Sequence, residues 1–327
     1  MEQGQALQPV VEFWLRAELR RVLRGVYKRH DEEIALPHPR NVTRASLGAV
    51  TGDRGAWLVA PKIDGRRALI VRARVFGDEF VVELDRRLVA TVLSPSGPGT
   101  TGLLAPNGPS GPNGPGSNGP LAPKGPSGPN GPSTDEVRVV VDAELCGGVY
   151  HVHDVFVLGG VQTHTLKFAT RLDLVEEAIS ELGVASVVAK TFVPLGSEIA
   201  RTAVATDGFI LSHSAAPATF GSDPWVLKWK PAERCTVDLL VERKKCGAHY
   251  SRRATARTSN GRRALAEFDA AIFQGTLPCI FEFAMRGGKW EPVLRREDKS
   301  TANTDFVVEQ TLVAVNEAIS FDEIVGN

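Results

Sequence analysis

The chain has 327 residues, with 38 lysine and arginine side chains against 38 aspartate and glutamate side chains, and its formal net charge is zero. This balance excludes a bulk polycation or an acidic tail, so any anionic partner must be bound by local placement of charge. Hydrophobic residues make up 43% of the chain, enough for a sizeable core. No apolar run approaches the roughly 18 residues of a membrane helix, so we expect no membrane partner. The length predicts about two domains.

The cysteines and the N-terminal residues bear on the cell compartment. The four cysteines are too few and too scattered for a disulfide framework, and none belongs to a CxxC pair typical of zinc sites. The first thirty residues carry arginines within an apolar pattern and lack an uninterrupted signal-peptide core. We therefore expect an intracellular protein with reduced thiols and not a secreted one.

In chain order, helical spacing of apolar residues predicts an opening helix over residues 11–26, followed by strands over 57–60, 68–75 and 79–84. The composition then changes abruptly over residues 94–133, which contain 11 prolines, 11 glycines and a single charged side chain. Such a segment cannot form a core. We interpret it as a disordered Gly/Pro-rich insertion between strands of one domain.

Further elements follow the insertion. The pattern predicts strands over residues 137–141 and 150–157, a helix over 172–182, strands over 236–242 and 277–284, and a closing helix over 306–319. The strand-rich composition after Pro231 indicates a second, smaller β domain.

The most informative segment is Lys-Ile-Asp-Gly-Arg-Arg, residues 62–67, because it places Lys62 at the end of a strand beside a turn. A lysine amine acts as a nucleophile only when it is neutral. Lowering its pKa from about 10.4 to about 7 requires roughly 4–5 kcal/mol, which neighbouring cations and partial burial can supply. Arg67, Lys228 and Lys230 are candidate cations for this purpose.

Charged residues recur at other strand ends. Residues 141–145 read Val-Asp-Ala-Glu-Leu, residues 206–211 read Thr-Asp-Gly-Phe-Ile-Leu, and residues 227–231 read Leu-Lys-Trp-Lys-Pro. Alternation along a strand sends Lys228 and Lys230 to one face, with Trp229 opposite. Glu144 and Asp207 carry oxygen atoms that suit ribose hydroxyls or a magnesium or manganese ion.

This ordered set of motifs resembles the covalent nucleotidyltransferase superfamily, which comprises ATP-dependent DNA ligases, RNA ligases and GTP-dependent mRNA capping enzymes. The KxDGxR form of the first motif, Asp207 where ligases usually carry glutamate, and the KWKP segment followed by Thr-Val-Asp at 236–238 favour the capping branch. Residues 296–299, Arg-Glu-Asp-Lys, resemble the closing RxDK motif of that branch.

The resemblance implies an α+β fold. It implies a two-lobed nucleotidyltransferase domain over residues 1–232, of the ATP-grasp-like ligase catalytic type with antiparallel sheets, interrupted by the insertion at 94–133. It further implies an OB-fold β-barrel with a C-terminal helix over residues 233–327. In this family the OB-fold domain is a lid, so closure over the cleft is expected to gate the first step.

The implied activity is that of an mRNA guanylyltransferase. Lys62 would form a covalent Lys62–GMP intermediate from GTP, and the GMP would pass to the 5′-diphosphate end of RNA to form the mRNA cap. GTP is then a substrate, and Mg2+ or Mn2+ is the expected cofactor. No triphosphatase or methyltransferase domain is evident, so separate proteins would supply those cap-forming steps. An intracellular capping enzyme would act in a nucleus or in a cytoplasmic viral replication site.

The resemblance also implies residue roles. The residues implied in catalysis are Lys62, Lys228, Lys230 and Asp207. Those implied in binding the nucleotide are Asp64, Arg67, Glu144 and Phe156 in the first domain, with Phe156 either stacking on the base or forming part of the core. The lid would add Arg296, Asp298 and Lys299, which would contact the β- and γ-phosphates. Glu144 and Asp207 would hold the metal.

The sequence departs from the family pattern at two positions, and it leaves two alternatives to a guanylyltransferase open. Ala143 stands where the family commonly has glycine, and Leu294 stands where an arginine is often found. The alternative enzyme is an ATP-dependent DNA or RNA ligase that uses the same lysyl-nucleotidyl chemistry. The other alternative is a catalytically silent module that binds RNA ends, although an intact Lys62 argues against it.

Overall fold

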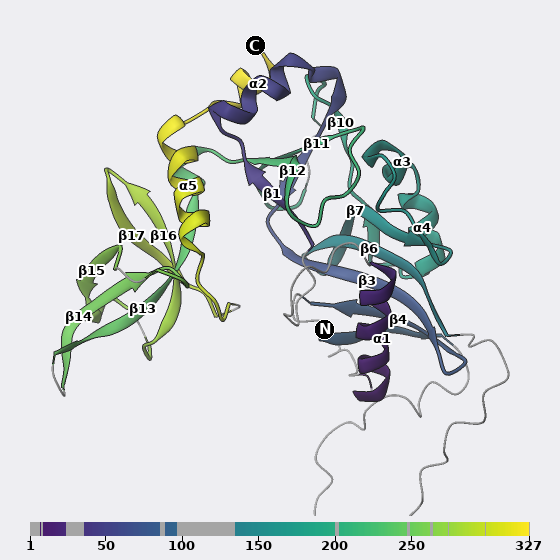
Figure 1. Ribbon diagram of the computed structural model, residues 1–327, viewed down its shortest axis with the longest axis horizontal. Coiled ribbons are helices and arrows are strands. Elements are labelled where there is room, and N and C mark those ends of the chain that lie inside the picture. Colours follow the sequence, from purple (N-terminus) through teal and green to yellow (C-terminus); the bar gives the residue numbers. More distant parts are fainter. Residues whose placement is uncertain are drawn as a thin grey trace, which may run out of the picture. The chain divides into compact units, whose positions relative to one another are not determined.

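The computed structural model describes residues 7, 9–23, 36–85, 89–96, 135–199, 203–246, 249–261, 264–273, 275–297 and 299–326. These residues form an α+β protein that consists mostly of antiparallel sheet (Figure 1). The chain divides into two compact units. Unit 1 comprises Met1–Pro37, Asp64–Thr191 and Ala215–Gly221, and unit 2 comprises His38–Ile63, Phe192–Ser214 and Ser222–Asn327.

Unit 1 is built on a sheet of seven described strands, in the order β5-β4-β3-β6-β7-β8, with β9 also paired to β7. Its strands are β3 (Arg66–Val75), β4 (Asp78–Leu84), β5 (Ala90–Ser96), β6 (Glu136–Cys146), β7 (Val149–Leu158), β8 (Val161–Gln162) and β9 (Val187–Ala189). β9 runs parallel to β7, and the other pairs are antiparallel. The central strands contain continuous runs of buried residues, such as 68–71 on β3 and 80–84 on β4, so both faces of the sheet are apolar and need cover.

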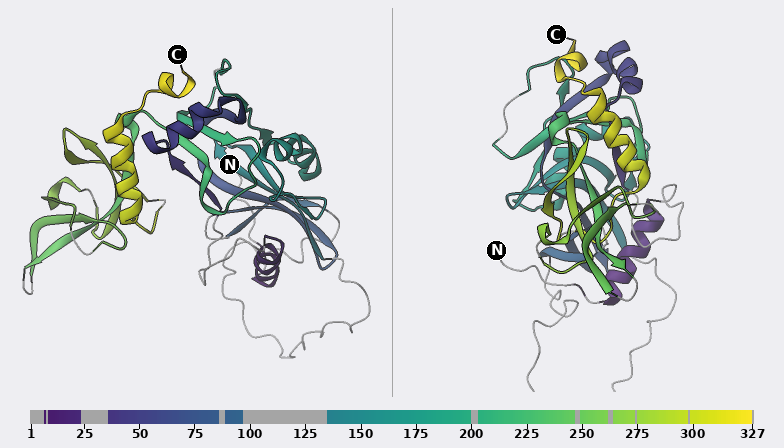
Figure 2. Two further views of the ribbon diagram at one scale, coloured as in Figure 1. Left: turned by 45° about the horizontal axis from the view of Figure 1, so that its top comes forward. Right: turned by 90° about the vertical axis from the view of Figure 1, so that its left-hand side faces the viewer.

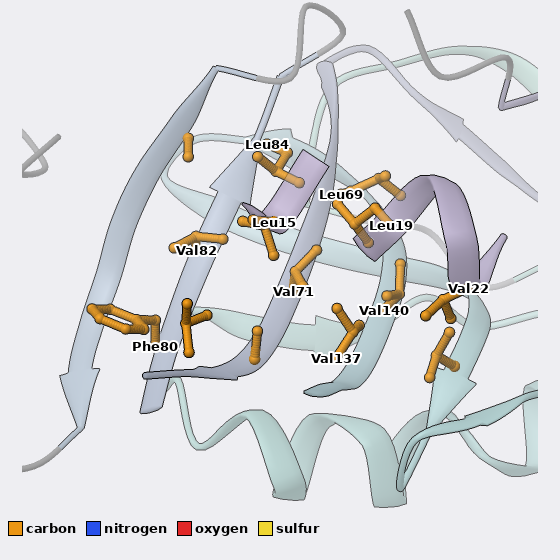
Figure 3. Packing of buried hydrophobic residues seen from close by; sticks show 14 of the residues in the cluster. Leu15, Leu19, Val22, Leu69, Val71, Phe80, Val82, Leu84, Val137 and Val140 are labelled. Carbon is orange, nitrogen blue, oxygen red and sulfur yellow. The ribbon is translucent and has the colours of Figure 1, made fainter. Parts of the chain in front are cut away.

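Helix α1 (Pro9–Val22) covers one face of that sheet. Its apolar residues recur at helical spacing, so Leu15, Leu19 and Val22 point toward Val71 and Val140 on the strands (Figure 3). The helices α3 (Phe168–Asp173) and α4 (Val175–Leu182) pack on the other face, through a second cluster of buried residues. Unit 1 is therefore a sheet between two helical layers.

Unit 2 contains two described antiparallel sheets. The first has the order β1-β12-β11-β2-β10 and consists of β1 (Pro37–Asn41), β2 (Trp57–Ile63), β10 (Val193–Pro194), β11 (Thr206–His213) and β12 (Gly221–Trp229). Helices α2 (Arg44–Gly52) and α6 (Phe321–Val325) pack with it, and Val50 and Ile324 are fully buried in the shared cluster.

The second sheet of unit 2 has the order β15-β14-β13-β16-β17. Its strands are β13 (Thr236–Cys246), β14 (His249–Arg257), β15 (Ala266–Asp269), β16 (Cys279–Arg286) and β17 (Lys289–Arg295). Helix α5 (Asp305–Glu317), drawn in yellow in Figures 1 and 2, packs against β13. Short 3-10 turns lie at Arg54–Ala56, Ala232–Arg234 and Ala270–Ile272.

The structure confirms the expected strands and lengthens most of them, and it changes two helices. The opening helix ends at Val22 instead of continuing to residue 26. The single helix expected over 172–182 is two helices, because the chain breaks at Leu174, which caps both. Helix α2 was not expected. It starts at a reciprocal Thr43–Ser46 capping box, a signal that the sequence does contain.

Residues 94–96 continue strand β5, and the rest of the Gly/Pro-rich insertion, up to residue 133, lies outside the described residues. The predicted boundary at residues 232 and 233 does not coincide with a unit boundary, because His38–Ile63 and Phe192–Ser214 group with the C-terminal residues. In the described part of the chain, no helix is long and apolar enough to cross a membrane.

Candidate active site

A lysine cluster lies where strands β2, β11 and β12 meet in unit 2. Strand β11 pairs with both neighbours, so that Gly208 lies opposite Lys62 and Ile210 lies opposite Lys228. The register between β11 and β2 shifts at Asp207, between Thr206 and Gly208. Such an irregularity re-aims a side chain, and here it brings the Asp207 carboxylate to the end of the lysine-bearing strand.

Asp207 forms ion pairs with two of the lysines. Its Oδ1 atom lies 2.8 Å from Lys62 Nζ, and its Oδ2 atom contacts Lys230 Nζ. The three side chains are only 15% (Asp207), 22% (Lys62) and 21% (Lys230) exposed. The residues implied in catalysis thus lie together, in a partly dehydrated place where charge interactions are stronger than in water.

The cluster perturbs proton binding in two directions. Burial alone would raise the pKa of Asp207, but hydrogen bonds and charge from Lys230 and Lys62 outweigh it and hold the pKa below its ordinary value. Burial lowers the pKa of Lys228 to about 8, and the positive charges of Lys230 and Lys62 add to that effect. Lys228 therefore loses its proton at a mildly alkaline pH, far below the ordinary range of a lysine.

Gly208 is required by a close approach of two backbones. A Cβ atom at this position would lie 2.0 Å from the carbonyl oxygen of Trp229, and the residue has φ +156°. Strand β12 can therefore approach β11 closely only if residue 208 is glycine. This contact fixes the two strands that carry Asp207 and the lysine pair.

Trp229 lies between the two lysines in sequence and packs into the core of unit 2. Its ring centroid lies 5.8 Å from that of Phe209 and 5.2 Å from that of Phe321, and its Nε1 donates to the Ile319 carbonyl at 2.7 Å. Helix α6 thereby supports the strand behind the lysines.

A cysteine also lies near the lysines. Burial raises the pKa of the Cys235 thiol, which makes it a poor nucleophile.

Unit 1 contains a second polar cluster, around Arg67. The Arg67 guanidinium forms a two-pronged contact with Asp142, with a Nε–Oδ1 distance of 2.8 Å, and donates to the Pro37 carbonyl at 2.6 Å. His153 Nε2 lies 3.2 Å from Asp142 Oδ2. Asp142 is 1% exposed, and although burial would raise its pKa, Arg67 and His153 hold it well below its ordinary value.

The other nucleotide-binding candidates of unit 1 differ in position. Glu144 is partly buried and lies opposite Arg67 in the β3–β6 register, while Asp64 is exposed in the turn between β2 and β3. Phe156 is fully buried and packs on Phe220 at a centroid distance of 5.3 Å. The proposed stacking of Phe156 on the base is therefore wrong: this ring belongs to the core under α1.

The candidates on the predicted lid are held by carboxylates of the same sheet. Arg296 Nη1 lies 3.1 Å from Asp238 Oδ1 and 3.4 Å from Glu282 Oε2. Lys299 also pairs with Asp238, which is 5% exposed. The cations expected to contact phosphate thus have carboxylate partners in this structure. Asp298 lies outside the described residues.

The expected metal does not fit Asp207 as it is arranged here. Both carboxylate oxygens already face ammonium groups, so a divalent cation would have to displace one of them. Glu144 belongs to unit 1 and Asp207 to unit 2. Across the described residues, no group of three His, Cys, Asp or Glu side chains is placed to hold a metal ion. We derive no chemical step through a metal.

Sequence reasoning missed several residues of these clusters. Asp142 holds Arg67 and is itself paired with His153. Asp238 and Glu282 hold the lid cations. In each case the resemblance implied a role for the cation and none for its carboxylate partner. Asp142 lies two residues from Glu144, which is opposite Arg67 in the β3–β6 register, so only the pairing of these strands brings Asp142 within reach of the arginine.

No protein-family model matches the chain, and no curated protein matches it. Among solved structures, the chain is similar to a Lig E DNA ligase at 13% identity, over 80% of this chain and 99% of that one, with a TM-score of 0.33. It is similar to a mycobacterial DNA ligase D complexed with ATP and MES at 12% identity, over 81% and 95% of the two chains, with a TM-score of 0.37. A structure named Pmar-Lig_PreS3 matches at 10% identity, over 86% of this chain and 60% of that one, with a TM-score of 0.37. Similarities this weak support no assignment, so the functional proposal relies on the chain's own residues.

Proposed function

We propose that the chain is an mRNA guanylyltransferase of the covalent nucleotidyltransferase superfamily, which transfers GMP from GTP to the 5′-diphosphate end of RNA. The observation that carries this proposal is the contact of Lys62 with Asp207, together with Lys228 on strand β12 and Lys230 just beyond its end. A nucleophilic amine, an acceptor for its proton and two further cations for phosphate are the groups that such a transfer needs.

In the first step, the Lys62 Nζ lone pair attacks the α-phosphorus of GTP. A nitrogen–phosphorus bond forms, the bond from the α-phosphorus to the bridging oxygen breaks, and pyrophosphate leaves with that electron pair. We assign the acceptance of the amine's proton to Asp207, whose Oδ1 lies 2.8 Å from Lys62 Nζ. Lys228 and Lys230 stabilise the charge that develops on the phosphate oxygens.

In the second step, an oxygen of the terminal phosphate of 5′-diphosphate RNA attacks the phosphorus of the Lys62–GMP adduct. The nitrogen–phosphorus bond breaks and the amine takes back a proton, which regenerates the enzyme. Splitting one displacement into two lets the same lysine cluster serve both. Magnesium or manganese bound to the triphosphate stays a prediction, as do separate triphosphatase and methyltransferase proteins and an intracellular site of action.

The choice of GTP rests on sequence features. Asp207 in place of glutamate, the KWKP segment and the closing Arg-Glu-Asp-Lys motif support the capping branch. The five-stranded sheet of β13–β17 has its first strand in the middle, between β14 and β16, and this order supports an OB-fold lid. A lid that delivers Arg296 and Lys299 to phosphate would have to exchange Asp238 for the nucleotide. An ATP-dependent ligase is the alternative enzyme.

Covalent capture of the nucleotide tests the proposal. The full chain is incubated with α-labelled GTP, denatured, and assayed for label on the polypeptide. We expect the label on the wild type and on Lys289→Ala, a matched change at an exposed lysine of β17, and no label on Lys62→Ala with its fold intact by circular dichroism. A labelled Lys62→Ala protein would overturn the assignment of the nucleophile.

A further inference from the structure

The end of the β13–β14 hairpin is a two-stranded ribbon. Strand β16 pairs with β13 only as far as Val241, and β15 pairs with β14 only from Arg253 onward. Beyond these points β13 and β14 pair with each other alone, as the lime-green strands of Figure 1 show. Side chains on this ribbon are therefore open to solvent, and the described ones at 243–245, 249, 250, 252 and 253 are exposed.

The ribbon concentrates positive charge in a chain whose net charge is zero. Residues 243–245 read Arg-Lys-Lys, and residues 252 and 253 are both arginine. Two of these five have an acidic partner: Glu267 lies 2.6 Å from Lys244 and 3.9 Å from Arg253. In the described part of the chain, no carboxylate forms an ion pair with the remaining three, which are Arg243, Lys245 and Arg252. We call these three with Tyr250 the ribbon patch.

Tyr250 gives the ribbon patch an aromatic surface. Its side chain is 64% exposed, it lies opposite Lys245 in the register of the two strands, and the Lys245 ammonium lies 5.8 Å from its ring centroid. The ring is thus held beside a cation and is open for stacking. An exposed aromatic ring among uncompensated cations is what a single-stranded nucleic acid needs, because phosphates bind the cations and an unpaired base stacks on the ring.

We propose that the ribbon patch binds a single strand of RNA, with its phosphates on Arg243, Lys245 and Arg252 and one base on Tyr250. The choice of RNA rests on the proposed function, since RNA is the acceptor of GMP. The patch itself is independent of the lysine cluster. An acidic protein would use the cations but would gain nothing from stacking.

The test is binding of the full chain to a fluorescent 12-nucleotide single-stranded RNA, measured by anisotropy at several salt concentrations. We expect Tyr250→Ala to weaken binding by roughly tenfold and Tyr250→Phe to keep it, because the ring provides the stacking. The combined change of Arg243, Lys245 and Arg252 to alanine should reduce the slope of log affinity against log salt by about 2, at roughly 0.7 for each lost phosphate contact. Lys244→Ala, whose charge Glu267 already neutralises, is the matched control and should change the slope by much less.

Two further ligands separate the possible partners. One is an abasic nucleic-acid strand of the same length, and the other is polyglutamate. We expect the abasic strand to bind about as weakly to the wild type as intact RNA binds to Tyr250→Ala. Equal binding of abasic and intact strands, or of polyglutamate and RNA, would overturn the proposal. Covalent capture of GMP by Tyr250→Ala should match the wild type. A protein that binds RNA through the patch and forms no adduct would therefore refute the catalytic proposal and leave this one standing.

Discussion

Replacing Lys228 with methionine should stabilise the folded protein at neutral pH. Burial and two neighbouring ammonium groups lower the pKa of Lys228 from 10.5 to about 8. A tenfold change in a proton equilibrium corresponds to about 1.4 kcal/mol, so the folded state bears a cost of about 3 kcal/mol when this lysine is charged. Methionine keeps the length of the side chain and removes the charge. We expect a gain of about 2–3 kcal/mol in the free energy of unfolding at pH 7.

The contribution of Lys228 to the free energy of unfolding changes with pH, because its pKa differs between the folded and the unfolded chain. Below pH 8, Lys228 is protonated in both the folded and the unfolded chain, and the cost is present in full. Between pH 8 and 10.5 the unfolded chain binds more protons than the folded one, so this contribution to stability rises with pH and the cost is gone above 10.5. The advantage of Lys228→Met over the wild type should therefore shrink across that range.

Urea unfolding followed by tryptophan fluorescence at pH 7, 8, 9 and 10 measures this difference. Lys230→Met, two residues further along the chain, is the matched control, and it should destabilise the protein because Lys230 pairs with Asp207. Both variants should form less Lys62–GMP adduct. A Lys228→Met protein that is less stable than the wild type at pH 7, or an advantage that stays constant up to pH 10, would refute the reasoning.

Three further changes test the packing and the second polar cluster. Gly208→Ala should lower the free energy of unfolding by about 1–3 kcal/mol and abolish adduct formation, because the new Cβ would lie 2.0 Å from the Trp229 carbonyl oxygen. Gly48→Ala, in the interior of helix α2 with nothing within 4 Å, should instead stabilise the protein by about 0.5–1 kcal/mol in the same thermal melt. Asp142→Asn should destabilise the chain at pH 7, and by less at strongly acidic pH. The pKa of this buried carboxylate is lower in the folded chain than in the unfolded one, so its ionised form stabilises the fold above the unfolded pKa and loses that effect as the pH falls. Equal losses of unfolding free energy in urea at pH 7 and pH 3 would count against this. Phe156→Leu should lower stability by about 1 kcal/mol and leave the KM for the nucleotide unchanged, while a higher KM in adduct kinetics would restore a role for its ring at the base.

Much of the fold was predictable because local patterns determine it. Runs of alternating, branched side chains predicted the strands around Lys62, and strand alternation correctly separated the lysine pair from Trp229. Helix α2 escaped because its start depends on the Thr43–Ser46 capping box and not on apolar spacing. The break at Leu174 escaped because no side-chain cap marks it within the apolar pattern. Element limits that depend on a cap are hard to read from periodicity alone.

The site was predictable where a motif contains the chemistry and unpredictable where tertiary pairing supplies it. The sequence places Lys62 and the lysine pair at strand ends, but the register shift that brings Asp207 to them is a property of the sheet. Asp142 pairs with a residue 75 positions away. No local pattern reveals that pair, just as none reveals that Phe156 faces the core.

The most direct measurement of the central claim compares two nucleotides on the same protein. The chain is incubated with magnesium and either α-labelled GTP or α-labelled ATP, then denatured, and the label on the polypeptide is counted before and after addition of 5′-diphosphate RNA. The account predicts retained GMP that the RNA discharges, and little retained AMP. Retained AMP without GMP would instead identify an ATP-dependent ligase, and a folded protein that retains neither label would contradict lysyl-nucleotidyl chemistry altogether.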